Sequence, residues 1–483
     1  MPGRYDKFRS QRGAVMNFLA QVDGSVFIPG NVRAAKINAF LRSWTNMSKL
    51  GGAMISSVSD LAGYAAELRY SQNKNMLSGL LDSVSALTKG RAKGERADIL
   101  GSLGVFYETV SSGVSARFDS PELVNGKMAA AMQAFFRLNG LAWWTEVLRD
   151  GAALSHSNYM AMQANKGFND INAELRRLLT LYNIDEGKWN LMRLGQMRSS
   201  DGKMYMTPES LNTLPQEMLE SYIRSVGRTV SPASVQNLID DLSQTMRAMF
   251  IDRAHHAVLE PNARNRAFML RGTKPGTVPG EILRYIGQFK SFSVAITQSV
   301  LGREVYGRGY DTLGEYLRKG RGDMLGLANM IGIYGVLGYG AMSIKELIKG
   351  REPRDPLNPQ TIIAALAQGG GLGLYGDFLF GEYSRFGKSL VSSIAGPVAG
   401  AADTIAELYT RVRNGDDTAA VAFKALLDNT PFNNLFWLRP LLDYAILFNI
   451  QESLNPGYLR RMERRVERQN EQQFLFKPSE VIR

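Results

Sequence analysis

The residues of this chain that could carry out chemistry are few, and their spacing departs from the common phosphate-binding patterns. Gly387–Ser389 resembles the end of a P-loop, but a P-loop also needs a glycine at position 382, where the chain has Glu382. The run Gly369–Gly376 lacks the spacing of a dinucleotide-binding loop, and no strand is expected before it. The sequence therefore predicts no nucleotide site, and these glycines are expected to allow tight packing or a bend.

The histidines form no pattern that is typical of a metal site or a catalytic triad. His255 and His256 are adjacent, so they point in different directions on a helix and cannot chelate one metal ion as an i, i+4 pair would. Asp252 and Glu260 lie four residues on either side of His256, which predicts ion pairs on a helix surface. His156 has no partner motif and is expected to be structural.

The composition excludes several further classes of chemistry. The chain has 483 residues and no cysteine, which rules out disulfides, thiolate metal sites and a cysteine nucleophile. Glu220 precedes a serine, as in lytic transglycosylases, but the rest of that motif is absent. A lone glutamate becomes a general acid only in a setting that raises its pKa. We therefore expect a protein that is not an enzyme and that uses no cofactor or metal.

The positive charge of the chain is concentrated near its N-terminus. The formal net charge is +12, and residues 1–98 hold 14 Lys or Arg against 7 Asp or Glu. The densest cluster consists of Lys89, Arg91, Lys93 and Arg96. Such a cluster favours DNA phosphates or anionic lipid, whereas admixed acidic residues would make it an ordinary solvated surface.

Helical periodicity runs through most of the elements that must position these residues. Ala34–Leu50, Met128–Arg149 and Ser234–Ala257 each fit one helix. The first is amphipathic, and its apolar face carries Ile37, Phe40, Leu41, Trp44 and Met47. Arg198–Pro208 differs, because Asp201 followed by Gly202 between short mixed runs predicts a hairpin. We expect an all-α fold, an extended assembly of many helices with a small β-hairpin near residues 198–208.

An uncharged run, Met324–Ile344, holds 21 residues and is long enough to cross a bilayer as a helix. Its glycines are more usual in membrane helices than in soluble ones. The alternative is a buried helix in a large soluble core. A second uncharged run, Pro356–Gly376, is a poor spanning helix because it contains Pro359 and three consecutive glycines. The membrane-contact candidates are Met324, Leu327, Ile331, Ile333, Val336 and Leu337.

The chain ends in a charged helix, Pro456–Gln473, followed by a short aromatic run. Its arginines follow one face with glutamates beside them, so the helix could be solvated and held by its own ion pairs. The apolar residues directly after it favour docking on a protein partner instead, because an exposed aromatic run is otherwise a liability. The docking candidates are Arg460, Arg464, Arg468, Phe474 and Phe476.

Two Gly/Pro-rich breaks, Arg271–Pro279 and Gly350–Pro359, divide the sequence. We expect a helical region over 1–270 that is basic at its N-terminal end and a second helical region over 271–349. A glycine-rich apolar region over 350–455 follows, and then the charged helix and tail over 456–483.

Several stretches, taken in order, resemble the C-terminal region of the large internal virion proteins of short-tailed-type bacteriophages and their prophages. None of them is a catalytic motif, so the resemblance depends on their number and order along most of the chain. The stretches are Ser48–Asp60 (SKLGGAMISSVSD), Phe135–Thr145 (FFRLNGLAWWT), Arg271–Glu281 (RGTKPGTVPGE), Gln288–Phe292 (QFKSF), Gly369–Gly381 (GGGLGLYGDFLFG) and Pro456–Arg464 (PGYLRRMER).

This resemblance implies a role in genome ejection. Internal virion proteins of this kind are packaged in the capsid, leave before the genome and assemble in the host envelope as part of a conduit. The resemblance therefore places the chain first in the virion interior and then in the host cell envelope. The partners it implies are other internal virion, portal or tail proteins and further copies of this chain, with phage DNA and the host membrane as further contacts.

Two other interpretations stay open at this point. A structural virion component, in the capsid core or the tail, would keep the uncharged runs inside its own core and would never meet a membrane. A divergent peptidoglycan hydrolase would be an enzyme, as some longer relatives are, although this chain lacks their peptidoglycan-cleaving motif.

Overall fold

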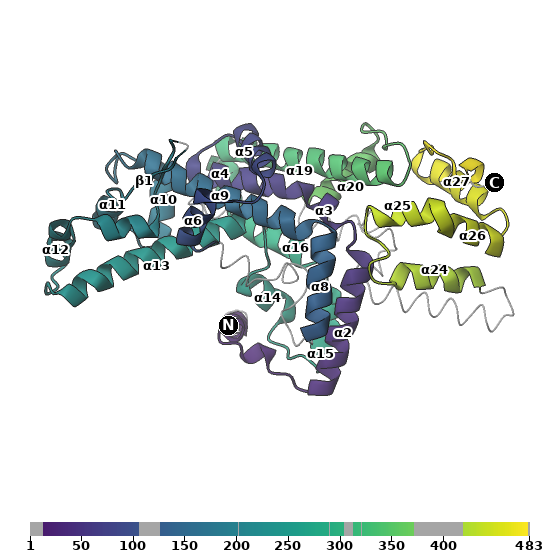
Figure 1. Cartoon of the computed structure of the whole chain (residues 1–483), viewed down its shortest axis with the longest axis horizontal. Helices are drawn as coiled ribbons and strands as arrows, with labels where there is room; N and C mark the ends of the chain where they lie inside the picture. The colour runs from purple at the N-terminus through teal and green to yellow at the C-terminus, as the bar shows by residue number, and fades with distance from the viewer. Residues whose placement is uncertain are drawn as a thin grey trace. The chain divides into compact units, whose positions relative to one another are not determined.

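A computed structural model describes residues 13–105, 126–200, 202–288, 290–303, 313–319, 321–370 and 419–481. The regular structure in these ranges is helical apart from one two-stranded sheet and one isolated β-bridge (Figure 1). The expected all-α fold is therefore confirmed.

The chain divides by spatial contact into two units. Unit 1 combines residues 1–59, 114–142 and 260–483, and unit 2 combines residues 60–113 and 143–259. These units follow contacts between distant segments, whereas the four regions expected from the sequence follow composition. That fourfold division stays a prediction.

Unit 2 is a set of helices packed on the long helix α13. In the described chain its elements are α4 (Asp60–Gln72), α5 (Met76–Lys89), α6 (Glu95–Leu103), α9 (Leu141–Gln163, which begins in unit 1), α10 (Ala173–Leu181), α11 (Glu186–Met192), β1 (Met197–Arg198), β2 (Met204–Tyr205), the 3-10 helix η4 (Pro208–Thr213), α12 (Gln216–Ser225) and α13 (Pro232–Ala257). Helix α13 packs against α4, α6, α12 and η4. The core contains the completely buried side chains of Trp189, Leu242 and Phe250.

Local signals set many of these boundaries. Ser231 begins α13 with a capping box, in which its hydroxyl accepts from the Ser234 backbone N–H and Pro232 occupies the first turn. Asn172 caps α10 in the same way, accepting from the Leu175 N–H at 2.9 Å. Strands β1 and β2 pair antiparallel, with Met197 opposite Tyr205, and the turn between them holds Gly202 at a φ of 80°. The hairpin expected near residues 198–208 is thereby confirmed.

Unit 1 draws its helices from three separate parts of the sequence. Its described elements are an N-terminal helix over residues 13–22, η1 (Ser25–Phe27), α2 (Val32–Lys49), α3 (Ala53–Ser56), η2 (Ser57–Ser59), α8 (Gly126–Leu138), α14 (Ala263–Leu270), α15 (Val278–Gly287), α16 (Ser291–Ala295), the π-helical segment η5 (Ile296–Leu301), α18 (Leu313–Lys319), α19 (Arg321–Ile348), α20 (Pro359–Gly369), α24 (Ala419–Asn429), α25 (Leu438–Leu442), the π-helical segment η7 (Asp443–Leu447), α26 (Phe448–Leu454), α27 (Tyr458–Asn470) and α28 (Pro478–Val481). An apolar cluster in this unit gathers Met47, Phe135 and Phe136 around Leu435.

Helix α2 buries the face opposite to its apolar one. Ile37 is 62% exposed, whereas Arg42 is almost completely buried and forms an ion pair with Glu281 of α15. The Tyr285 hydroxyl of α15 donates to Asn38 Oδ1 at 2.5 Å. Of the five residues on the predicted apolar face, Met47 is buried, whereas the other four are exposed. Arg42 is buried instead, because it pairs with a helix more than 200 residues away.

The single helix expected over Met128–Arg149 is two helices in the structure. Gly140 has a φ of 77°, which ends α8, and α9 begins at Leu141. The Asn139 side chain holds this break, since it accepts from the Leu141 N–H and donates to the Leu50 carbonyl. A continuous helix could not supply the first contact, because the Leu141 N–H would bond to the Arg137 carbonyl.

Candidate functional site

Helix α19 contains the segment that is long and apolar enough to cross a membrane, Met324–Ile348, with a mean hydropathy of 1.3. In the described part of the chain, no other helix meets both criteria. Only 22% of its most apolar stretch is buried inside the protein. The core helix of a soluble protein would be mostly buried, so the exposure favours contact with a medium outside this chain.

A line of widely spaced apolar side chains runs along the exposed side of α19, interrupted by the exposed Asn329 and Gly332. Leu325 and Val336 are 74% and 71% exposed, and Leu347, eleven residues further on, is exposed as well. Eleven residues make about three helical turns, so these side chains share one direction. Of the membrane-contact candidates, Val336 lies on this line, while Met324, Leu327, Ile331, Ile333 and Leu337 are half-buried.

The opposite side of α19 packs against α20. Met330 and Tyr334 are buried there, one helical turn apart. A methyl group on Gly338 would lie 2.0 Å from the Ala365 carbonyl oxygen, and one on Gly369 would lie 1.9 Å from the Tyr334 carbonyl oxygen. The two backbones therefore touch through glycine, which is how helices commonly associate in membranes.

A pocket of about 480 Å³ lies at the C-terminal end of α19. The last turns of α19 supply Lys345, Ile348 and Lys349 to its wall. The remaining lining comes from α2, α3, η2, residue 351, the segment from Asn434 to Met462, and Phe474. All of these residues belong to unit 1.

The terminal helix α27 has one inward edge and one outward basic face. Leu459 and Val466 are buried, whereas Arg460, Arg464 and Arg468 are exposed. Among the described side chains, no ion pair joins these three arginines to a glutamate. Glu463 instead accepts from the backbone N–H and the hydroxyl of Ser479, both at 2.8 Å, and so fastens the tail to the helix.

The docking candidates after α27 have different environments. Phe474 forms a β-bridge with Arg351, whose guanidinium lies 5.1 Å from the centre of its ring, and it lines the pocket. Phe476 is 67% exposed, although its carbonyl accepts from the Tyr444 hydroxyl. Phe474 is therefore engaged within unit 1, and the docking candidates that are exposed are the arginines and Phe476.

The basic cluster of unit 2 occupies the loop between α5 and α6. Lys89, Arg91 and Lys93 are exposed, and Arg91 pairs with Glu146 of α9 at 2.5 Å. Burial, with a smaller contribution from Glu146, raises the pKa of Asp150 to about 7, although Arg96 and Arg91 oppose this effect. Two acidic residues of α9, Glu146 and Asp150, therefore lie close to this basic cluster.

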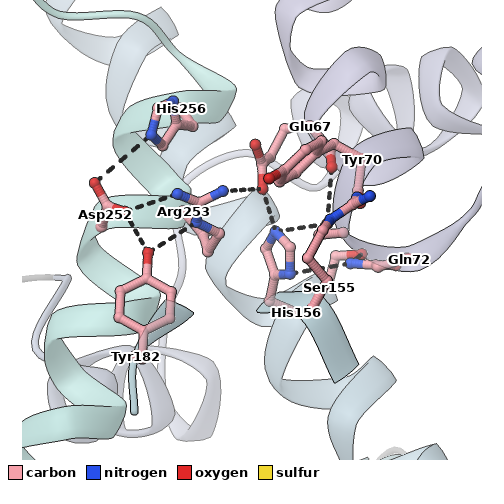
Figure 2. A network of polar contacts seen from close by, with 11 residues as sticks. Glu67, Tyr70, Gln72, Ser155, His156, Tyr182, Asp252, Arg253 and His256 are labelled. Atoms are coloured by element: carbon pink, nitrogen blue, oxygen red, sulfur yellow. Dashed lines mark hydrogen bonds and ion pairs between the residues drawn. The ribbon is translucent and has the colours of Figure 1, made fainter. Parts of the chain in front are cut away.

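A network of buried polar side chains joins α4, α9 and α13 of unit 2 (Figure 2). Glu67 lies 3.3 Å from Arg253 and 3.5 Å from His156, and all three side chains are almost completely buried. Burial lowers the pKa of His156, although Glu67 opposes this, so the imidazole is neutral near pH 7. Gln72 approaches the other ring nitrogen of His156 at 3.4 Å.

The network continues towards the surface through Tyr182 and Asp252. The Tyr182 hydroxyl bonds to Asp252, and Arg253 contacts both groups. His256 lies 3.8 Å from Asp252, four residues earlier, and this contact is an ion pair when the imidazole is protonated. Glu260, also expected on this helix, lies beyond the end of α13 at Ala257. Burial works against the charge of Arg253, but Glu67, Tyr182 and Asp252 outweigh it, so the pKa of Arg253 is raised.

This network was missed in the sequence, where His156 had no visible partner. One signal could have revealed it: α4 carries small or apolar residues around its whole circumference, which indicates a helix buried on all sides. A glutamate in such a helix must meet a cation, because a buried unpaired charge is very costly. The network ties three helices together, and its central groups are closed to solvent.

Within the described residues, no group of three or more His, Asp or Glu side chains is placed to hold a metal ion. The P-loop-like Gly387–Ser389 lies outside the described residues. No protein-family model, curated protein or solved structure matches this chain.

Proposed function

We propose that this chain is a non-enzymatic internal virion protein of a bacteriophage, which assists genome ejection by forming part of a channel across the host envelope. The observation that supports the proposal is the apolar line on α19, which is exposed along a helix of membrane-spanning length. Exposed large apolar side chains on one face of a helix are typical of a surface that contacts lipid or another protein.

In this proposal the chain works together with further copies and with other internal virion, portal or tail proteins. The outward arginines of α27 supply a surface for such a neighbour, since in the described chain none of Arg460, Arg464 and Arg468 forms an ion pair within 4 Å. Phage DNA is a further proposed contact. Its phosphates would bind the exposed lysine and arginine side chains around the loop between α5 and α6.

The test is flotation of the purified protein with vesicles of phosphatidylethanolamine and phosphatidylglycerol. Val336 lies at the middle of Met324–Ile348 and is exposed, so Val336→Arg should leave the soluble fold intact. A central arginine costs about 2.5–3.5 kcal/mol on insertion scales, and we expect the variant to lose vesicle association. Ile333→Arg, one turn away, should act in the same direction.

Met218→Arg is the matched control, because Met218 is an exposed apolar residue of α12 in unit 2. This variant should float as the parent does. If Val336→Arg also floats unchanged, α19 does not enter lipid and the proposed membrane role is refuted.

A structural virion component without membrane contact is the second candidate. The observation that favours it is the close backbone contact between α19 and α20, which would also suit a helix pair within a soluble assembly. Failure of the parent protein to float, together with its presence in purified particles, would establish this alternative.

A further inference from the structure

We propose that the pocket at the C-terminal end of α19 binds an anionic phospholipid, with the phosphate on the cations of its wall and an acyl chain on its apolar side. The inference rests on the proposed function, because a lipid reaches this pocket only if α19 meets a membrane. Its experiment is therefore chosen so that the two ideas can fail separately.

The first argument is the size and composition of the pocket. Its volume of about 480 Å³ lies in the range of small-molecule sites, roughly 300–1,000 Å³. Aromatic and aliphatic side chains form much of the wall, and Tyr444 and Phe448 meet edge to face with their ring centres 5.2 Å apart. Such a wall suits an acyl chain.

The second argument is charge. Lys49, Lys345, Lys349, Arg351 and Arg439 all line the pocket, and Asp443 is the acidic residue among the described lining. Asp443 already accepts from Arg439 Nε at 2.8 Å, so an arginine of the same pocket compensates its negative charge. Glu346 pairs with both Lys349 and Arg351, at 3.9 and 3.5 Å. The cations of the wall still outnumber these two carboxylates, which favours an anionic head group.

The third argument is a buried polar side chain that faces the pocket. Gln451 lines it and is only 7% exposed, and in the described structure its carboxamide has no hydrogen-bond partner. An amide on a pocket wall that has no protein partner is available to bond to a ligand. A phosphate or glycerol oxygen of a bound lipid would satisfy it.

The fourth argument is position. Lys345, Ile348 and Lys349 are the last residues of α19 on this wall, and Met324–Ile348 is the span-length segment. When α19 crosses a bilayer, its C-terminal end reaches the level of the lipid head groups. Basic pockets at this level are the usual sites of anionic head groups.

The experiment is calorimetric titration of the full-length protein with dihexanoyl phosphatidylglycerol below its micellar limit, so that no membrane is present. We expect saturable binding. Dihexanoyl phosphatidylcholine, which has no net charge, and inorganic phosphate, which has no acyl chain, should each bind at least about tenfold more weakly. Equal binding of either one would overturn the proposal.

Two variants test the site itself. A side chain on Gly52, which lines the pocket, would meet nothing within 4 Å of its Cβ, so Gly52→Leu fills the pocket without a backbone clash and should abolish binding. Gly101→Leu in α6 is the control, because its Cβ also meets nothing and it lies outside the pocket. Unchanged binding by Gly52→Leu would refute the site.

Lys349→Gln should weaken phosphatidylglycerol binding about fivefold, because one basic residue near an anionic head group has an effect of this order. Arg464→Gln removes an exposed cation of α27 outside the pocket and should change nothing. Monomeric phosphatidylglycerol could bind while the parent protein fails to float with vesicles. That result would support the lipid-binding pocket and refute the proposed membrane function.

Discussion

Asp150 is a single carboxyl group whose surroundings oppose its charge. Burial in α9 and the nearby Glu146 raise its pKa from 3.8 to about 7. The folded protein therefore holds a proton on Asp150 at pH values where the unfolded chain has lost it. By linkage, this group makes the folded state less stable as the pH rises from about 4 to about 7.

Asp150→Asn should remove this dependence, because asparagine has the shape of the protonated acid and no proton to lose. Relative to the parent, the variant should gain about 2.5 kcal/mol in free energy of unfolding between about pH 5 and about pH 8. Urea denaturation at both pH values measures the difference. Asp98→Asn, at an exposed position of α6, is the control, and parallel pH profiles for parent and Asp150→Asn would contradict the assignment.

Glu67 is the counter-ion on which the buried network of unit 2 depends. Glu67→Gln leaves Arg253 buried with its main compensating charge removed, which should lower the free energy of unfolding by about 3–5 kcal/mol. Asp241→Asn removes an exposed carboxylate that pairs with Lys188 and should cost less than about 1 kcal/mol. Similar costs for the two variants, measured by chemical denaturation, would show that the network contributes no more than a surface pair.

At the scale of elements, the contact between α19 and α20 depends on positions where two backbones meet. A Cβ on Gly338 would collide with the Ala365 carbonyl and with the backbone of Gly369, and backbone cannot move aside as a flexible side chain can. Gly340, two residues later, has open space around its Cβ position. The two glycines share one helix but have opposite packing environments.

Gly338→Ala should therefore destabilise unit 1 by about 1–3 kcal/mol through overpacking. Gly340→Ala should be neutral or stabilise by up to about 1 kcal/mol, because alanine favours a helix more than glycine does. Thermal unfolding of both variants measures the contrast. Equal effects would mean that α19 and α20 do not approach each other through Gly338 in solution.

Helix α27 is an element that presents two different surfaces. Its inner edge holds Leu459 and Val466, while Met462 lines the pocket. Its outer face carries the arginines, and the side-chain Nε of Arg464 donates only to the Arg460 carbonyl one turn earlier. A deletion of the whole helix would remove both surfaces, so a charge reversal on the outer face is the sharper test.

At the scale of the whole molecule, we expect Arg464→Glu together with Arg468→Glu to reduce incorporation of the chain into particles by about tenfold or more. Reversed charges repel a partner surface that is complementary to the arginines, which changes specificity as well as affinity. Both residues are exposed, so the fold should persist. Quantitative immunoblotting of purified particles measures incorporation, and circular dichroism verifies the fold.

Arg33→Glu together with Lys36→Glu makes the same charge change on exposed residues of α2 and serves as the control. It should be incorporated as the parent is. Normal incorporation of the α27 variant would instead show that these arginines are only solvated.

Features that depend on neighbouring residues could be predicted from the sequence alone. Asp201 and Gly202 indicated the hairpin because a tight turn needs a residue that tolerates positive φ. The length of α19 followed from the absence of charge in Met324–Ile344, because a charge within such a run would be costly to bury. The all-α class followed from helical periodicity in the same way.

Features that depend on distant partners were decided only by the tertiary structure. Periodicity identified an apolar face of α2, but it could not show that Arg42 would be buried in an ion pair with Glu281. It also could not show that the Asn139 side chain would reach the Leu50 carbonyl and break a helix, or that Phe474 would stack on Arg351 and close a pocket. In each case the contact joins residues far apart in the chain, and local propensities of a few tenths of a kcal/mol are smaller than the energies of such contacts. The sequence by itself therefore determined which segments are helical and which one could cross a membrane, and the tertiary contacts decided which faces are buried and where a ligand can bind.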